Sequence, residues 1–350
     1  FEETSETQIG DAGAGENWHL LPDSDELIWW SERHDWVHLY LYDLTSGELK
    51  NRITTGTGNV VDIVHVDADE RTIWFIGQGF EDGRDPYFEH LYRIGFDGSG
   101  MSLLTPEDAH HSVDFSAEVG AFIDSYSTPD TPPVTVMRSS DDGELLGTLE
   151  TADVSRLVET GWKPPTPITV KARDGATDLY GLMFTPTRLD STASYPVVNY
   201  IYPGPQSGSV RTRSFAPARR DHHALAELGF VVVVLDGMGT PGRSKEFHDA
   251  YYGNMSDNTL PDQVGAIRQL ADRHPWIDLE RVGVWGHSGG GFAAAQAMFR
   301  YPDFYSVGIA ESGNHDNRNY EDDWGERYQG LLVETNGSDN YAEEANQTIA

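Results

Sequence analysis

The segment with the clearest chemical potential in this sequence is Gly286-His287-Ser288-Gly289-Gly290, which fits the pattern G-x-S-x-G. In this pattern a serine occupies a turn between a strand and a helix that is so tight that only glycine fits beside it. The turn exposes the hydroxyl and directs the first N–H groups of the helix toward any anion that forms nearby. The chemistry indicated is nucleophilic attack by Ser288. Short Gly/Ser patterns also occur in strand-to-helix turns of nucleotide-binding folds. The residues around the motif must therefore distinguish a catalytic serine from such a turn.

The residues on either side of the motif predict the strand and the helix that such a turn requires. Val282, Val284 and Trp285 supply a short apolar strand before the turn. Residues 292–299 form an Ala-rich helical run, which Pro302 brings to an end. Both neighbours of the turn therefore favour a catalytic serine at this position.

The wider pattern around the motif is that of an α/β domain. Residues 196–202 and 230–235 are apolar runs of strand length, and residues 260–273 carry apolar side chains at helical spacing. The β-branched run 230–235 is typical of a parallel strand that is covered on both faces. Alternating strands and helices predict a mostly parallel sheet, and they place Ser288 at the carboxyl end of a strand, where such sheets carry their sites.

Residues 1 to about 160 show a different, repetitive pattern. An apolar strand, a loop, an alternating strand and a turn rich in Asp and Gly recur along this region. The strand pairs are 27–30 with 38–43, 73–76 with 90–94, and 121–124 with 133–136. Such repeats predict the blades of a β-propeller, with a β-sandwich as the alternative. About three blades are present, whereas closed propellers begin at about four, so we expect further blades upstream of Phe1.

A proline cluster separates the two patterns. Residues 161–167 read Gly-Trp-Lys-Pro-Pro-Thr-Pro, a stiff and extended segment that cannot continue a sheet ladder. The sequence therefore predicts two domains. Residues 1–160 form the C-terminal part of a β-propeller, and residues 161–350 form an α/β-hydrolase domain.

The composition excludes several classes of partner. The chain has 350 residues with 24 Lys and Arg against 57 Asp and Glu, a formal net charge of −33, which argues against binding to nucleic acid or to an anionic membrane surface. Two interpretations of this charge remain open, a salt-adapted protein and an ordinary acidic enzyme. There is no cysteine, hence no disulfide framework. No apolar run reaches the length of a membrane span, and no basic-then-apolar signal opens the chain.

Four motifs in order resemble those of a known family. They are Tyr-Ile-Tyr-Pro-Gly-Pro at 200–205, Leu-Asp-Gly-Met-Gly at 235–239, Gly-His-Ser-Gly-Gly-Gly at 286–291, and Glu-Arg-Tyr-Gln-Gly-Leu at 326–331. Their order and spacing resemble the prolyl oligopeptidase family, and most of all its dipeptidyl peptidase IV branch. Residues 31–42 also resemble a late propeller blade of bacterial members. The resemblance runs from roughly Trp18 to the end of the chain.

The resemblance implies a serine exopeptidase that releases N-terminal Xaa-Pro or Xaa-Ala dipeptides through an acyl-enzyme. Its substrates would be peptides with proline or alanine at the penultimate position, and no cofactor or metal is expected. Family members are often dimeric and exported, so the resemblance implies a homodimer and a periplasmic or secreted location, neither of which the residues themselves show. We interpret Glu2-Glu3 and Glu343-Glu344 as solvated charges, so the restriction to dipeptides rests on the resemblance.

The resemblance also assigns roles to individual residues. Ser288 matches the nucleophile, Tyr202 the hydroxyl that stabilises the oxyanion, and Gly289 the residue whose backbone N–H does the same. Tyr320 and Trp324 match two aromatic positions that line the proline pocket. Trp324 and Gly289 both depart from the family, which usually has tyrosine at these positions. The backbone donor of Gly289 survives this departure, whereas Trp324 would narrow the pocket or remove a hydroxyl.

Structural explanations compete with three of these roles. Tyr202 ends an apolar run, so it also fits a core aromatic on a buried strand. Tyr320 and Trp324 are four residues apart, so at helical spacing they share one face and also fit ordinary core packing. Paired aromatic walls suit a flat, apolar proline ring, which favours the pocket.

The serine also needs a base and an orienting carboxylate, which α/β-hydrolases place later in the chain as Asp and then His. Asp303 and His315 occur in this order, but we reject the pair. Asp303 lies where the chain turns at the far end of the predicted helix, and His315 follows a strand end toward the cleft or a surface loop. His287 adjoins the nucleophile in sequence, so its side chain should point elsewhere. The family places both groups beyond Ala350, so we expect a fragment, truncated at both ends, that lacks the triad Asp and His and is inactive alone.

Two other functions stay open at this stage. One is an acylaminoacyl-peptidase-like or esterase member of the same fold, which would prefer a blocked amino terminus over a free one. The other is a catalytically silent propeller-hydrolase that binds partners. The presence of Ser288 and Tyr202 argues against the silent protein.

Overall fold

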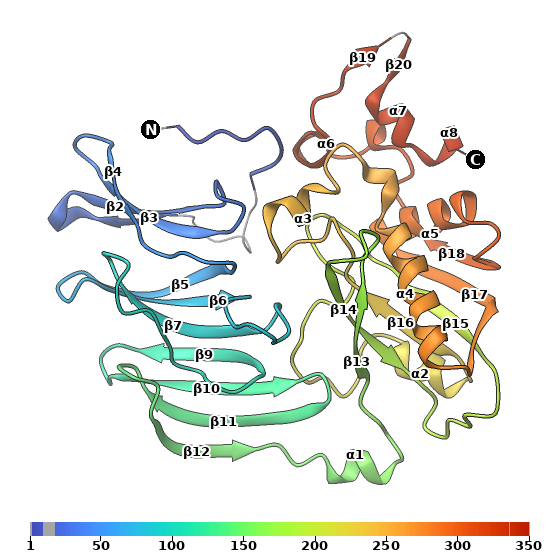
Figure 1. The fold of residues 1–350 in the computed structure, drawn as a ribbon, viewed down its shortest axis with the longest axis horizontal. Coiled ribbons are helices and arrows are strands. Elements are labelled where there is room, and N and C mark those ends of the chain that lie inside the picture. Colours follow the sequence, from blue (N-terminus) through green and yellow to red (C-terminus); the bar gives the residue numbers. More distant parts are fainter. Residues whose placement is uncertain (1, 10–17, 336, 350) are drawn as a thin grey trace. The chain divides into compact units, whose positions relative to one another are not determined.

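The computed structural model describes residues 2–9, 18–335 and 337–349, and the chain forms two compact units (Figure 1). The first unit comprises Phe1–Val154 together with the short segments Arg213–Phe215 and Gly242–Glu246. The second unit comprises Ser155–Thr212, Ala216–Pro241 and Phe247–Ala350. Two segments of the later sequence therefore belong to the unit built by the first part of the chain.

The first unit consists of three four-stranded antiparallel sheets in which strands pair with their neighbours in sequence. The first sheet contains β1 (Trp18–Leu21), β2 (Glu26–Ser31), β3 (His38–Asp43) and β4 (Leu49–Arg52). The second contains β5 (Asn59–Asp67), β6 (Thr72–Gln78), β7 (Glu89–Gly95) and β8 (Ser102–Leu103). The third contains β9 (His110–Ser116), β10 (Ala121–Thr128), β11 (Thr131–Ser139) and β12 (Leu145–Thr151). This is the meander of a propeller blade, repeated along the chain.

The strand pairs predicted from the sequence are the two inner strands of each sheet. Most of these strands carry a clear apolar pattern, as in β3, where five of six residues are buried. Two outer strands, β4 and β12, escaped the prediction because they carry little apolar pattern, whereas the outer strand β5 is rich in Val and Ile and was missed all the same. β4 has two exposed and two half-buried residues, and β12 is exposed along almost its whole length.

An equivalent hydrogen bond occurs in each of the first two sheets. The backbone N–H of Leu39 donates to Thr54 Oγ1 at 3.0 Å, and the N–H of Leu91 donates to Thr105 Oγ1 at the same distance. In both sheets this leucine follows a buried histidine on the third strand. The sequence repeat therefore corresponds to a repeated side-chain contact as well as to repeated strands.

The second unit is built on a six-stranded sheet in the order β13-β14-β16-β15-β17-β18. The strands are β13 (Thr166–Lys171), β14 (Asp178–Phe184), β15 (Tyr195–Tyr200), β16 (Val231–Leu235), β17 (Ile277–His287) and β18 (Val307–Glu311). β16, β15, β17 and β18 run parallel, whereas β13 and β14 pair antiparallel. The prediction of a mostly parallel sheet holds for the part that carries Ser288, but the whole sheet is mixed.

Helices cover this sheet and complete the core of the second unit (Figure 1). All five residues of β16 are buried, and β16 packs in one core cluster with α4 (Leu260–Arg273) and α5 (Gly289–Arg300). Shorter helices complete the unit: α1 (Ser155–Glu159), α2 (His222–Glu227), α3 (Lys245–Asp249, shared with the first unit), α6 (Asp322–Gln329), α7 (Asn340–Glu344) and α8 (Asn346–Ile349). Three-residue 3-10 turns lie at Pro22–Ser24, Met255–Asp257 and Asn317–Asn319. Within the described ranges, no helix is long and apolar enough to cross a membrane.

Candidate active site

Ser288 lies at the tip of the predicted elbow, between the last residue of β17 and the first residue of α5. Its backbone has φ 59° and ψ −120°, a conformation that L-residues avoid and that marks a strained turn. The Ser288 N–H donates to the carbonyl of Glu311 on β18 at 2.8 Å. The Ser288 carbonyl accepts from the N–H of Gly291 at 2.8 Å and so begins the helix. Hydrogen bonds on both sides therefore hold the strained residue in place.

The glycines around Ser288 are required by close backbone contacts. A Cβ on Gly286 would lie 2.3 Å from the carbonyl oxygen of Gly290, and one on Gly290 would lie 2.1 Å from that of Ile201. A Cβ on Gly291 would lie 2.3 Å from the carbonyl oxygen of Glu311. Carbon and oxygen cannot approach so closely, so the helix reaches the sheet edge only because these side chains are absent.

Tyr202 leaves the sheet at the same edge as Ser288. Tyr200 at the end of β15 pairs in parallel register with Trp285 on β17, and the N–H of Ile201 donates to the Trp285 carbonyl at 3.0 Å. A Cβ added to Gly289 would lie 3.9 Å from Tyr202 Cζ. The phenol ring therefore stands beside the first residue of α5, next to the nucleophile in the chain.

The loop that follows Tyr202 is fixed by three side chains that sequence reasoning missed. The Tyr202 N–H donates to Oγ of the buried Ser209 at 2.9 Å. The N–H of Val210 donates to Asp236 Oδ1 at 3.1 Å, and His248 Nε2 donates to the Pro205 carbonyl at 2.6 Å. No local sequence pattern predicts these contacts, because they join segments that come together only in the folded loop.

Two further residues contact the Tyr202 side chain itself. Gln206 Nε2 donates to the Tyr202 hydroxyl oxygen at 3.3 Å. The guanidinium carbon of Arg211 lies 5.3 Å from the centre of the Tyr202 ring, within the range of a cation–π contact. Tyr202 is half-buried rather than sealed in the core, so its hydroxyl stays accessible.

Tyr320 and Trp324 contact each other, but they do not share a helix. Tyr320 has an extended backbone before α6, whereas Trp324 lies inside α6, so the expectation of one helical face was wrong. Their rings nevertheless meet edge to face with centroids 5.5 Å apart. The Trp324 ring also contacts the Tyr328 ring, with centroids 5.3 Å apart. Tyr320 is 42% exposed, so one end of this aromatic row is open to solvent.

Tyr251 packs against the buried end of this aromatic row. It packs in one buried cluster with Tyr328 and Trp324. Burial is the main cause that raises the pKa of the Tyr251 hydroxyl, and the carboxylates of Asp257 and Glu344 raise it further. The aromatic row therefore runs from the exposed Tyr320 to the buried Tyr251.

The titratable side chains near Ser288 in sequence have other partners. His287 Nδ1 lies 3.7 Å from Glu311 Oε2, with both side chains about half exposed. His315 Nδ1 pairs with Asn346 Nδ2 at 2.6 Å. Asp303 is exposed in the turn that follows α5. These positions assign none of the three a role as the base or as its orienting carboxylate.

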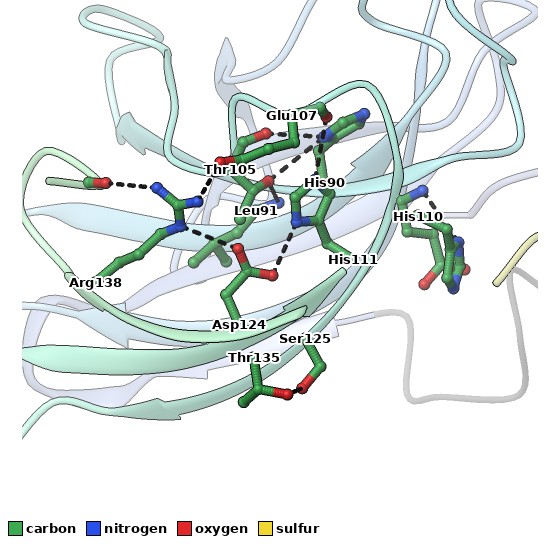
Figure 2. Close-up of polar contacts among 12 residues, drawn as sticks. His90, Leu91, Thr105, Glu107, His110, His111, Asp124, Ser125, Thr135 and Arg138 are labelled. Carbon is green, nitrogen blue, oxygen red and sulfur yellow. Dashed lines mark hydrogen bonds and ion pairs between the residues drawn. The ribbon is translucent and has the colours of Figure 1, made fainter. Parts of the chain in front are cut away.

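A separate polar cluster lies in the third sheet of the first unit (Figure 2). Among the described residues, Glu107, His111 and Asp124 offer metal-ligand atoms within 4.8 Å of one another. Arg138 on β11 already pairs with both carboxylates, at 3.0 Å to Asp124 and 2.6 Å to Glu107. His111 Nδ1 completes the set with a contact of 2.8 Å to Asp124. Because Arg138 supplies the positive charge, we interpret the cluster as a link between β9, β10 and β11.

Meandering antiparallel sheets followed by an α/β domain with a serine elbow define a propeller-plus-hydrolase protein. Comparison with family models gives the same arrangement. Residues 2–133 match the dipeptidyl peptidase IV N-terminal region, and residues 218–348 match the prolyl oligopeptidase family. The chain belongs to the prolyl oligopeptidase family, in its dipeptidyl peptidase IV-like branch.

Individual relatives agree with this assignment. Dipeptidyl peptidase 8 of Homo sapiens is 32% identical over 254 residues, 71% of this chain and 28% of that protein. A probable dipeptidyl peptidase 4 of Arthroderma benhamiae is 28% identical over 323 residues, 90% of this chain and 40% of that protein. The crystal structure of Porphyromonas gingivalis dipeptidyl peptidase 4 superimposes with a TM-score of 0.81 at 25% identity, covering 95% of this chain and 46% of that one. The chain thus spans less than half the length of these relatives.

Proposed function

We propose that the protein to which this chain belongs is a serine-type dipeptidyl peptidase that releases Xaa-Pro or Xaa-Ala from the amino terminus of peptides. The observation that carries the proposal is the strained Ser288 elbow with the Tyr202 ring beside Gly289. This arrangement offers a nucleophile, a hydroxyl and a backbone N–H at one sheet edge. The names of the relatives support the same class of reaction.

The reaction begins when Ser288 Oγ attacks the carbonyl carbon of the scissile peptide bond and gives its proton to a general base. The base is a histidine that we assign to none of the described residues. Negative charge then develops on the carbonyl oxygen, where the Tyr202 hydroxyl and the Gly289 N–H donate hydrogen bonds. Preorganised donors of this kind are worth about 3 kcal/mol each. Collapse of the intermediate breaks the C–N bond, the protonated base gives its proton to the leaving amine, and an acyl-enzyme remains on Ser288. Water then attacks the acyl carbon, loses a proton to the base, and releases the dipeptide as the proton returns to Ser288 Oγ.

Specificity for proline or alanine is assigned to the pocket beside Tyr320 and Trp324. Their edge-to-face rings offer an apolar corner, and the exposed face of Tyr320 leaves it open to a substrate. A flat pyrrolidine ring packs well against such walls. The indole of Trp324 is larger than the tyrosine usual in the family, so this pocket would be narrower.

The test is hydrolysis of Xaa-Pro chromogenic anilides by the full-length enzyme. Ser288→Ala should abolish turnover, whereas Ser306→Ala should not, because Ser306 is an exposed serine outside the elbow. A comparison of free and blocked amino termini separates a dipeptidyl peptidase from an acylaminoacyl peptidase. Turnover that survives in Ser288→Ala would refute the nucleophile. Failure of an active-site phosphonate to label the wild-type enzyme would favour a silent binding protein.

A further inference from the structure

The Tyr202 hydroxyl has a neighbour that can decide where its proton points. A tyrosine hydroxyl donates one hydrogen bond and accepts others, so its single proton serves one acceptor at a time. Gln206 Nε2 carries only donors and faces the hydroxyl oxygen at 3.3 Å. Gln206 therefore occupies an acceptor site of the hydroxyl and leaves the proton free for another partner.

The remaining partner lies on the side of α5. The Tyr202 ring stands beside Gly289, whose N–H is the other proposed oxyanion donor. We propose that Gln206 is a positioning residue that keeps the Tyr202 proton directed toward the oxyanion. This inference rests on the proposed function and adds to it the residue that preorganises one of its two donors.

The backbone under Gln206 is shaped to hold this amide. A Cβ on Gly204 would lie 2.8 Å from Gln206 Oε1 and 3.1 Å from Nε2, so the amide lies directly over the Gly204 Cα. Gly204 does not adopt the left-handed backbone conformation that favours glycine. Glycine is therefore needed at this position to leave room for the Gln206 amide. The loop that carries both residues is anchored by Ser209 and His248.

Arg211 restrains the same ring from another direction. Its guanidinium lies 5.3 Å from the ring centre, and its own backbone has φ 63°, a strained value for arginine. The ring is thus held by a cation near its face and by an amide at its hydroxyl. A donor fixed before the reaction costs no reorganisation when the charge develops, which is the advantage of such an arrangement.

The first experiment compares substitutions of Gln206 in the full-length enzyme. Gln206→Leu removes the amide at similar size and should lower kcat about 3- to 10-fold with little change in KM, the range of one ordinary hydrogen bond. Gln206→Glu presents a carboxylate that accepts the Tyr202 proton, so it should lower kcat further than Gln206→Leu. Wild-type kcat in Gln206→Glu would overturn the proposal, because it would mean that residue 206 accepts from Tyr202.

Gly204→Ala reaches the same hydrogen bond from the backbone side. The added methyl group collides with the movable end of the Gln206 side chain, so it should displace the amide and lower kcat about as much as Gln206→Leu. Combining the two substitutions should give no further loss. Gln269→Leu is the control, because this half-buried glutamine bonds to Lys171 far along the chain from the loop. An additive loss in the Gly204→Ala, Gln206→Leu double variant would overturn the proposal.

A double-mutant cycle with Tyr202→Phe separates this inference from the proposed function. In the phenylalanine background, Gln206→Leu should have no effect, since there is no proton to direct. If Tyr202→Phe alone leaves kcat unchanged, the oxyanion role fails. If Tyr202→Phe lowers kcat and Gln206→Leu does not, only the positioning role fails.

An NMR measurement tests the hydrogen bond without catalysis. The 13C resonance of the Tyr202 hydroxyl-bearing carbon, assigned by its loss in Tyr202→Phe, should shift in Gln206→Leu whether or not peptides are cleaved. An unchanged resonance would refute the hydrogen bond.

Discussion

At the scale of single residues, the chemistry proposed here depends on the Tyr202 hydroxyl. Tyr202→Phe removes this one donor and keeps the ring beside Gly289. We expect kcat to fall about 100- to 1,000-fold while KM changes little, because the lost bond forms only when charge develops. Steady-state kinetics on a Xaa-Pro anilide checks the prediction. Tyr195→Phe at the start of the same strand β15 is the control, and an equal loss there would indicate a general effect on the strand.

The residues of the site divide into those that the sequence could predict and those that it could not. Ser288 was predictable because the elbow is local, with its glycines adjacent in the chain. Tyr202 and Gly289 followed from the resemblance, and the parallel register of β15 and β17 explains why they meet. Gln206 and Asp236 were not predictable, because their contacts depend on the path of a loop.

At the scale of elements, the approach of α5 to β15 requires glycine at position 290. Gly290→Ala would place a methyl carbon 2.1 Å from the Ile201 carbonyl oxygen. We expect it to lower the free energy of unfolding by about 1–3 kcal/mol and to abolish activity, because helix and strand must separate at the site. Denaturant unfolding and anilide hydrolysis measure the two effects.

The control for this prediction is a glycine in open space on a neighbouring helix. Gly265 in α4 has no heavy atom within 4 Å of the position of an added Cβ. Gly265→Ala should therefore stabilise the protein by about 0.5–1 kcal/mol, the helix-propensity difference between the two residues, and leave activity unchanged. Equal behaviour of the two variants would contradict the steric argument.

The helices and strands were predictable where one buried face gives the sequence a periodic spacing of apolar residues. The inner strands of the sheets and α4 are apolar at the right period, and α4 has the predicted bounds Leu260–Arg273. The outer strands β1, β4 and β12 have few buried residues, so their side chains carry no such pattern. Tyr320 shows the opposite error. Its spacing from Trp324 fits a helix, yet Tyr320 lies before the first turn of α6.

At the scale of the whole molecule, buried histidines should make the protein sensitive to acid. Burial is the largest cause that lowers the pKa of His38 to about 4 and that of His90 to about 3. The unfolded chain binds these protons near its ordinary pKa of about 6.5, and the folded chain does not. Stability should therefore fall as pH drops below about 6, by up to about 1.4 kcal/mol per pH unit for each histidine.

Denaturant unfolding from about pH 7 to about pH 5 measures this slope. Replacing His90 by glutamine should flatten it. A slope that is the same in wild type and in His90→Gln would contradict the assignment of a neutral buried His90. Above about pH 7 both states leave the histidines neutral, so the variants should show no pH-dependent difference there.

The charge of the whole chain predicts a response to salt. Even if each of the 24 Lys and Arg paired with one carboxylate, 57 − 24 = 33 carboxylates would remain without a cationic side chain. Their mutual repulsion destabilises the folded state, and added ions screen it. We therefore expect the Tm of the full-length protein to rise when NaCl increases from about 0.01 M to about 0.15 M, where the screening length falls from about 30 Å to about 8 Å.

Beyond about 1 M NaCl the screening length is only about 3 Å, so further salt adds little screening of the repulsion. A further rise of Tm and of peptidase activity above that concentration would favour a salt-adapted protein, and falling activity would favour an ordinary acidic enzyme. A Tm that decreases already in the lower range would show that ion pairs such as Arg71–Glu26 outweigh the repulsion, contrary to the prediction.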